Sequence, residues 1–127
     1  MHEWLSNAYW SPGVSYERVL KAMEFSALVV GAYDNDMQVG YMRLVSDRTT
    51  FAWVSDVIVD ESYRGQGIAR AMVRFAMEHP DVVDVRRWCL ATRDAHEVYR
   101  PLGFAPLTYP DHFMWIGPQS PPKPSQQ

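Results

Sequence analysis

The stretch that decides the fold reads Val57-Ile58-Val59-Asp60-Glu61-Ser62-Tyr63-Arg64-Gly65-Gln66-Gly67-Ile68-Ala69. It runs from an apolar, β-branched segment typical of a buried strand, through a polar loop with two glycines, into a helical pattern. Glycines let a backbone approach a ligand closely, and the first turn of a helix directs unpaired N–H donors and a positive dipole end at an anion. The stretch therefore indicates a phosphate or pyrophosphate site. The alternative is a plain loop whose glycines only serve the turn.

Two well-known nucleotide-binding loops do not match this stretch. A P-loop needs Gly-Lys followed by Ser or Thr, and Gly67 is followed by Ile68. The dinucleotide-binding pattern needs a third glycine, and its strand does not lead out of an antiparallel hairpin. A nucleotide-binding fragment is therefore only a third hypothesis for the function.

The segments before this stretch predict a helix and three antiparallel strands. Ser15 is placed to cap the helix. The apolar face of that helix comprises Tyr16, Val19, Leu20 and Met23. Residues 27–33 and 38–46 are apolar runs joined by a turn, which predicts a hairpin. Residues 50–59 are apolar on both faces, as in a central strand covered on both sides.

The segments after it predict two helices and one more strand. The helix that opens at Ile68 ends at His79-Pro80, and residues 85–90 form the next strand. A last helix over residues 95–102 ends at Gly103, with its final turn weakened by Pro101. A strand, a helix and a second strand in this order form a parallel crossover. The sequence therefore predicts an α/β domain with a mixed sheet flanked by helices.

Composition limits the domain organisation and the partners. The chain has 127 residues, 47% of them hydrophobic, which predicts one domain over residues 1–117 and a disordered Pro-rich tail over residues 118–127. The net charge of −3 disfavours nucleic acid as a partner, and the lone Cys89 excludes an internal disulfide and a multi-cysteine metal site. No apolar run is long enough to span a bilayer and the N-terminus lacks a signal sequence, so we expect a cytoplasmic protein without a membrane partner or a metal.

Two motifs resemble the GNAT superfamily of N-acetyltransferases. The first is the acetyl-CoA signature of that family, Arg/Gln-x-x-Gly-x-Gly/Ala, which is met here by Arg64, Gly67 and Ala69. The second is the end of the family's last core helix, an aromatic residue followed by three others and Gly-Phe, which residues 99–104 match with Tyr99 as the aromatic residue. The resemblance spans residues 9–116, with the elements in the order given above.

The resemblance implies how acetyl-CoA binds as a cosubstrate. In the family, two parallel central strands separate at a bulge, the acyl-CoA arm enters the gap, and the pyrophosphate lies on the N-terminus of the following helix. The corresponding residues for the arm are Val57, Ile58 and Val59. Those for the pyrophosphate are Arg64, Gly65, Gln66, Gly67, Ile68, Ala69 and Arg70. The acetyl group then passes directly from the thioester to a primary amine of a small molecule or a protein.

Tyr99 and Asp56 are the candidate catalytic residues. The resemblance implies that the Tyr99 phenol protonates the departing thiolate and that a backbone N–H of Ile58 or Val59 binds the oxyanion. Asp56 lies inside an apolar strand, where a carboxylate needs a partner or a task, so it is either the general base or part of a structural hydrogen bond. Four aromatic residues are candidates either for an acceptor pocket or for the core. These are Tyr9, Trp10, Tyr41 and Trp53.

The N-terminus is short for this family, whose members usually open with one more strand. The resemblance instead places the first residues of this chain inside the helix that follows that strand. We therefore predict an exposed sheet edge and a homodimer that covers it. The main alternative function is a non-catalytic acyl-CoA-binding module, because the short N-terminus and the unassigned base are compatible with a lost acceptor site.

Overall fold

A computed structural model describes residues 1–117 of the chain, and the predicted tail, residues 118–127, lies outside the described residues. The chain divides into two compact units, Met1–Leu90 and a second that begins at Ala91, and each is described by itself. The prediction of one domain over residues 1–117 stays a prediction. The first unit holds α1 (His2–Asn7), α2 (Tyr16–Glu24), β1 (Leu28–Asp34), β2 (Met37–Ser46), β3 (Phe51–Val59), η1 (Glu61–Tyr63), α3 (Ile68–Glu78) and β4 (Arg87–Cys89). The second holds α4 (His96–Tyr99), η2 (Arg100–Leu102) and η3 (Pro110–His112).

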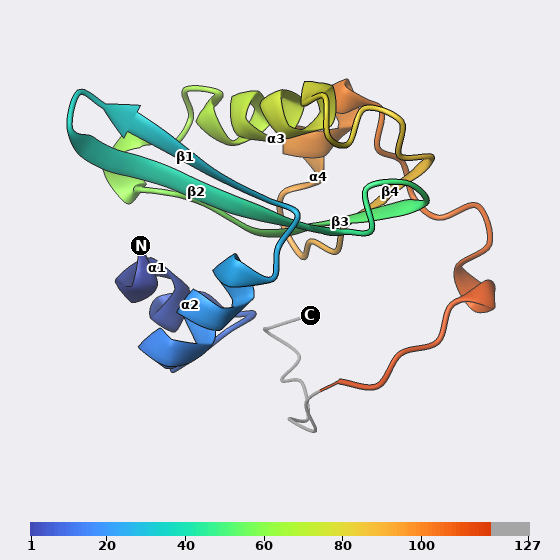
Figure 1. Ribbon diagram of the computed structural model, residues 1–127, viewed down its shortest axis with the longest axis horizontal. Coiled ribbons are helices and arrows are strands. Elements are labelled where there is room, and N and C mark those ends of the chain that lie inside the picture. The colour runs from blue at the N-terminus through green and yellow to red at the C-terminus, as the bar shows by residue number, and fades with distance from the viewer. Residues whose placement is uncertain (118–127) are drawn as a thin grey trace. The chain divides into compact units, whose positions relative to one another are not determined.

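The four strands form one sheet in the order β1-β2-β3-β4 (Figure 1). The pairs β1–β2 and β2–β3 are antiparallel, and β3 and β4 are parallel, with α3 as their crossover. The predicted hairpin, central strand and parallel crossover are thereby confirmed. β4 is shorter than the predicted strand over residues 85–90, because β3 pairs with it at only three positions.

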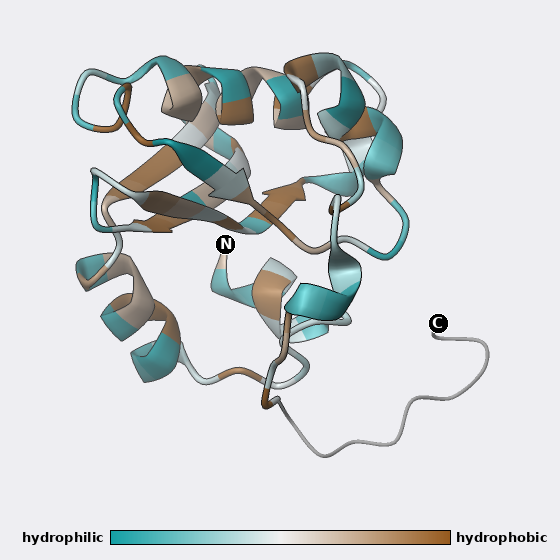
Figure 2. Cartoon of the chain, turned by 90° about the vertical axis from the view of Figure 1, so that its right-hand side faces the viewer, coloured by the Kyte–Doolittle hydropathy of each residue, from teal (hydrophilic) through white to brown (hydrophobic). Residues whose placement is uncertain are grey.

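Helices cover both faces of the sheet in the first unit (Figure 1). α3 lies on one face, and α1 and α2 lie on the other (Figure 1). Apolar residues are frequent on the strands, whereas the helices carry both apolar and polar residues (Figure 2). α3 approaches β2 closely, since a Cβ on Gly40 would lie 3.1 Å from the side chain of Met72. On the opposite face Leu5, Val19 and Tyr41 form a buried cluster.

The helix α2 begins as predicted but buries less of its apolar face. Ser15 is the N-cap, and its hydroxyl accepts a hydrogen bond from the Arg18 backbone N–H at 3.2 Å. Of the predicted inward residues Val19 is buried, whereas Tyr16 is 56% and Leu20 is 45% exposed. The reason is that α1 shares this face of the sheet, so α2 packs along a narrow stripe beside Leu5.

The last predicted helix is present but changes type. It is α-helical only over His96–Tyr99 and then continues as the 3-10 turn Arg100–Leu102. Gly103 closes it in the left-handed conformation, at φ 103°. Pro101 explains the change, because its ring removes a backbone N–H from the last turn.

Candidate functional site

The loop between β3 and α3 has the backbone that its glycines predict. Gly65 lies at φ +81° and Gly67 at φ +83°, a region that side chains with a Cβ rarely adopt. A Cβ built on either glycine would meet no atom within 4 Å, so this side of the loop is open. The loop is held from outside by the Tyr63 hydroxyl, which donates to Asp34 Oδ2 at 2.7 Å. The glycine-rich loop is thus a fixed and open surface.

Donors without acceptors converge at the start of α3. Gly67 is the N-cap and supplies no side-chain acceptor, and the first turn of α3 has no acidic residue. The first hydrogen bond across this end runs from Ala71 N–H to Gly67 O at 3.0 Å, which leaves the N–H groups of Ile68, Ala69 and Arg70 without an intrahelical acceptor. The Nε of Arg70 is buried and has no partner among the described residues. These groups fit a bound anion such as a diphosphate.

β3 has a bulge in its pairing with β2, close to the glycine-rich loop. Met42 of β2 lies opposite both Asp56 and Val57, and Asp56 has a positive φ of 56°. The pairing of β3 with β4 covers only Phe51, Ala52 and Trp53. The bulge that the resemblance implied is therefore present, and the pairing of β3 with β4 ends before it. Over residues 54–59 the side of β3 that faced β4 pairs with no described strand.

The residues predicted to hold the acyl-CoA arm lie on this unpaired part of β3. Val57 and Ile58 are partly buried, and Val59 is 8% exposed. The carbonyl oxygen of Val59 accepts a hydrogen bond from Arg64 Nε at 3.0 Å, so Arg64 links the end of the strand to the loop. Gln66 lies exposed between the two glycines. The predicted arm and pyrophosphate residues are therefore consecutive on one strand, loop and helix start.

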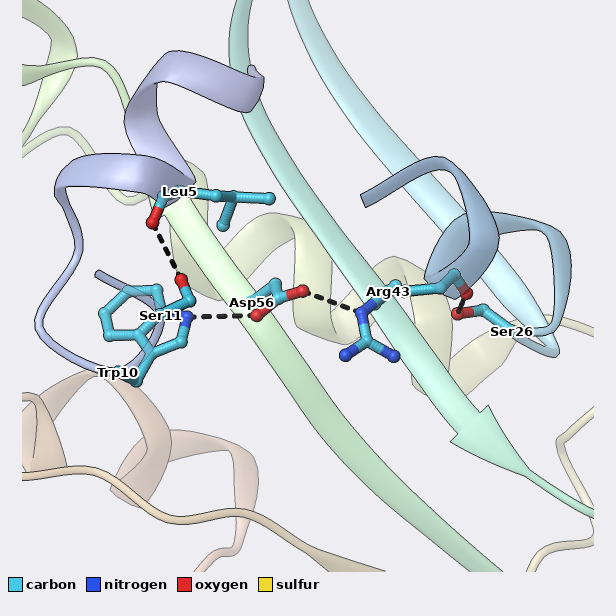
Figure 3. Close-up of polar contacts among 7 residues, drawn as sticks. Leu5, Trp10, Ser11, Ser26, Arg43 and Asp56 are labelled. Carbon is cyan, nitrogen blue, oxygen red and sulfur yellow. Dashed lines mark hydrogen bonds and ion pairs between the residues drawn. The ribbon is translucent and has the colours of Figure 1, made fainter. Parts of the chain in front are cut away.

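Asp56 has two hydrogen-bond partners, and both were missed in the sequence. Trp10 Nε1 donates to Oδ1 at 3.0 Å, and Arg43 Nε donates to Oδ2 at 2.7 Å (Figure 3). The Arg43 and Asp56 side chains are 19% and 13% exposed, so this ion pair is mostly buried. The structural hydrogen bond that we considered for Asp56 is therefore present. The sequence did contain a signal for this ion pair. The apolar run 38–46 has one arginine, the adjacent run 50–59 has one aspartate, and two opposite charges in neighbouring buried strands can pair.

The four aromatic candidates separate into one core residue and three exposed ones. Tyr41 is 1% exposed, and its buried hydroxyl has no partner among residues 1–117. The pKa of Tyr41 is raised to about 12, mainly by burial and to a smaller extent by the charge of Asp56, while the charge of Arg43 acts in the opposite direction. Tyr41 therefore belongs to the core, while Tyr9, Trp10 and Trp53 are 44%, 43% and 38% exposed.

Tyr99 lies in the second unit, whereas the bulge and the glycine-rich loop lie in the first. It is 8% exposed, and its ring packs edge-on against Phe104 with centroids 5.9 Å apart. The spacing of the motif thus produces a local aromatic pair. The role of Tyr99 as a proton donor stays a prediction from the resemblance.

The described residues contain neither a candidate metal site nor a helix that could span a membrane. Within residues 1–117 no three His, Cys, Asp or Glu side chains gather in a way that could hold a metal ion. In the same part of the chain, every helix is too short or too polar to cross a membrane.

Comparison with known proteins identifies the family. The family model described as "Acetyltransferase (GNAT) domain" matches residues 26–106. A GNAT-family protein from Xanthomonas campestris pv. campestris is 36% identical, with a TM-score of 0.86 over 91% of this chain and 82% of that one. A GNAT-family acetyltransferase from Streptococcus pneumoniae TIGR4 is 28% identical, with a TM-score of 0.67 over 91% and 89% of the two chains. No curated protein matches the sequence.

The matched residues include the strand, the loop and the helix start described above, as well as Tyr99 and Gly103. The family match therefore agrees with the geometry of the first unit and with both sequence motifs. The chain belongs to the GNAT family of acetyltransferases.

Proposed function

We propose that this protein transfers an acetyl group from acetyl-CoA to a primary amine. One observation supports the proposal most: an unpaired stretch of β3 leads directly into a loop and helix start whose donors lack acceptors. A CoA thioester has an amide-bearing arm that can pair with a free strand, and a diphosphate that such donors can bind. Both halves of this ligand therefore find a counterpart on consecutive residues.

The residues of this chain would hold the cosubstrate in two ways. The backbone of Val57, Ile58 and Val59 would pair with the arm. The backbone N–H groups of residues 65–70, with the side chains of Arg64 and Arg70, would hold the diphosphate. The bound acetyl-CoA supplies an activated thioester.

The transfer has three chemical demands. The amine nitrogen attacks the thioester carbon, so a C–N bond forms and the C–S bond breaks, with the electron pair leaving on sulfur. A backbone N–H of Ile58 or Val59 would stabilise the oxyanion between these events. The amine proton leaves to a base, for which Asp56 is the candidate, and Tyr99 would protonate the thiolate.

One observation favours the alternative of a non-catalytic acyl-CoA-binding module. Both carboxylate oxygens of Asp56 already accept hydrogen bonds, from Trp10 and Arg43. Each oxygen keeps another lone pair, so a proton could still be accepted there, but the carboxylate also has a clear structural task. Asp56 is therefore either the base or the residue that positions Trp10 and Arg43.

Turnover with a panel of amines distinguishes the two functions. The protein is incubated with acetyl-CoA and each amine, free CoA is titrated as a thiol, and the N-acetyl product is detected by mass. We expect amine-dependent CoA release with a mass gain of one acetyl group on the acceptor. Tight binding of acetyl-CoA by calorimetry, without product for any amine, would instead establish the binding module.

The sheet edge supports the predicted homodimer. β1 pairs with β2 on one side and with no described strand on the other, and its Val29 and Tyr33 are 41% and 61% exposed. An exposed edge with apolar side chains favours pairing with a second chain. We therefore expect a dimer by light scattering, and a Val29→Lys change on this edge to shift it toward monomer. A monomer at every concentration, with a cooperative melt, would refute this proposal.

A further inference from the structure

Arg43 uses only one of its three nitrogens. Its Nε binds Asp56, and the two terminal nitrogens have no hydrogen-bond partner among the described residues. In Figure 3 neither of these two nitrogens has a dashed line to another of the residues drawn. A guanidinium carries five N–H donors, and only one of those of Arg43 is bonded to Asp56. The other four are available to bind a ligand, although the side chain is only 19% exposed. Its free edge is the pair of nitrogens that binds planar anions in a forked arrangement.

A second unpaired group lies beside it on the same face of β2. Tyr41 is two residues before Arg43, and alternate residues of a strand point to the same side of the sheet. Its hydroxyl is fully buried and also has no partner among residues 1–117. A buried polar group nearly always has a partner, so the buried Tyr41 hydroxyl, next to the free edge of the partly buried Arg43 guanidinium, indicates an acceptor that comes from outside the chain.

This position lies next to the place proposed for the reaction. Arg43 is paired with Ser55, the residue just before the bulge at Asp56. Ser55 belongs to the part of β3 that is not paired with β4. The indole of Trp10, bonded to Asp56, is 43% exposed, and the ring of Tyr9 packs edge-on against it at 5.1 Å. A ligand on the free edge of Arg43 would therefore have two accessible aromatic rings near it.

The charges at this position favour a carboxylate over a phosphate. Asp56 already balances the charge of Arg43, so a doubly charged phosphate would be repelled by the aspartate without a second cation to compensate. A single carboxylate fits the planar fork and carries one charge. The Asp56 carboxylate, in turn, attracts an ammonium group on the same ligand. The ion pair is thus complementary to a molecule with both a carboxylate and an amine.

We propose that the acceptor of this enzyme is an amino acid or a similar amino-carboxylate, held through its carboxylate by the terminal nitrogens of Arg43. This inference rests on the proposed acetyl transfer and specifies its substrate class. Arg43 is then a specificity-determining residue, and Asp56 positions its guanidinium and faces the substrate amine.

The test compares each common amino acid with its own carboxamide. The pair differs in one charged group, and the carboxamide has the less basic amine, so chemistry alone would favour the carboxamide. We expect the wild type to prefer the acid in kcat/KM, and Arg43→Gln to lower the acid-to-amide ratio by about 10- to 100-fold, the range for a lost charge-assisted hydrogen bond. The ratio is also measured in Arg43→Gln/Asp56→Asn, which has no unpaired buried charge.

A binding measurement separates failure of this inference from failure of the proposed function. Calorimetry on the CoA complex compares the affinity for acids and carboxamides without any turnover. Binding that requires the carboxylate, with no acetyl transfer, would retain the carboxylate site and reject the transferase. Transfer to acids and amides at similar kcat/KM, or an unchanged ratio in a folded Arg43→Gln protein, would overturn the inference. A panel in which neither binding nor transfer depends on the carboxylate would do the same.

Discussion

Replacing Gly67 by glutamate tests the anion site at the start of α3. Gly67 has φ +83°, and a Cβ there meets no atom within 4 Å, so the substitution strains the backbone but creates no clash. A residue with a Cβ in the left-handed region costs about 1 kcal/mol of stability. The variant should therefore fold.

The effect on CoA binding should be larger than the effect on folding. The new carboxylate sits at the N-cap, where backbone donors would meet the diphosphate. Two like charges about 4 Å apart in a watery setting repel by about 1 kcal/mol, so two phosphate charges give about 2 kcal/mol, or roughly a 30-fold loss of affinity. Gly67→Gln has the same strain and size without the charge, and should lose less. The difference between the two variants should shrink as salt is raised.

Gly13→Glu is a matched control for this experiment. Gly13 has φ +72° and also no atom within 4 Å of an added Cβ, so the strain and the added charge are the same. We expect both glutamate variants to melt at similar temperatures, while calorimetry shows weaker CoA binding only for Gly67→Glu. A folded Gly67→Glu protein that binds CoA like the wild type would show that the diphosphate does not lie at this helix start.

Three further predictions concern single side chains. If the hydroxyl of Tyr99 is the proton donor, Tyr99→Phe should lower turnover by about 10²–10⁴-fold with little change in CoA affinity. Tyr109→Phe, at an exposed tyrosine, serves as the comparison. Equal turnover in both variants would remove Tyr99 from the mechanism. Hydrogen bonds from the Thr50 side chain and from nearby backbone N–H groups lower the pKa of Asp47. The Asp47 carboxylate therefore stabilises the fold at pH values above its unfolded pKa of about 4, and this stabilisation is lost as the pH falls. Urea unfolding of Asp47→Asn should thus vary less with pH below about 4 than that of the wild type, and parallel curves would argue against this assignment. The pKa of Tyr41 is about 12 in the folded protein and 10 in the unfolded chain, so the wild type should lose stability as the pH rises from 10 to 12. Tyr41→Phe should lose less stability over this range, and an equal loss in both proteins would contradict the assignment.

The elements and the glycine-rich loop could be predicted because their signals are local. Strands β1 to β3 follow apolar runs, Ser15 caps α2, and His79 ends α3. The turn from Val59 to Ile68 needs glycines at the two positions that adopt positive φ. Each of these features depends on neighbours within one turn or one strand, so the sequence carries it directly.

The environment of Asp56 was decided by tertiary structure. Its partners Arg43 and Trp10 are 13 and 46 residues away, and the β2–β3 register together with the course of the α1–α2 segment brings them to one carboxylate. The burial of Tyr41 depends in the same way on Leu5 and Val19 packing over β2. The sequence by itself determined where a strand, a glycine-rich loop and a helix follow one another, because those choices are local. Which side chains meet beside the bulge depended on pairing register and helix packing, since these are properties of residues far apart in the chain.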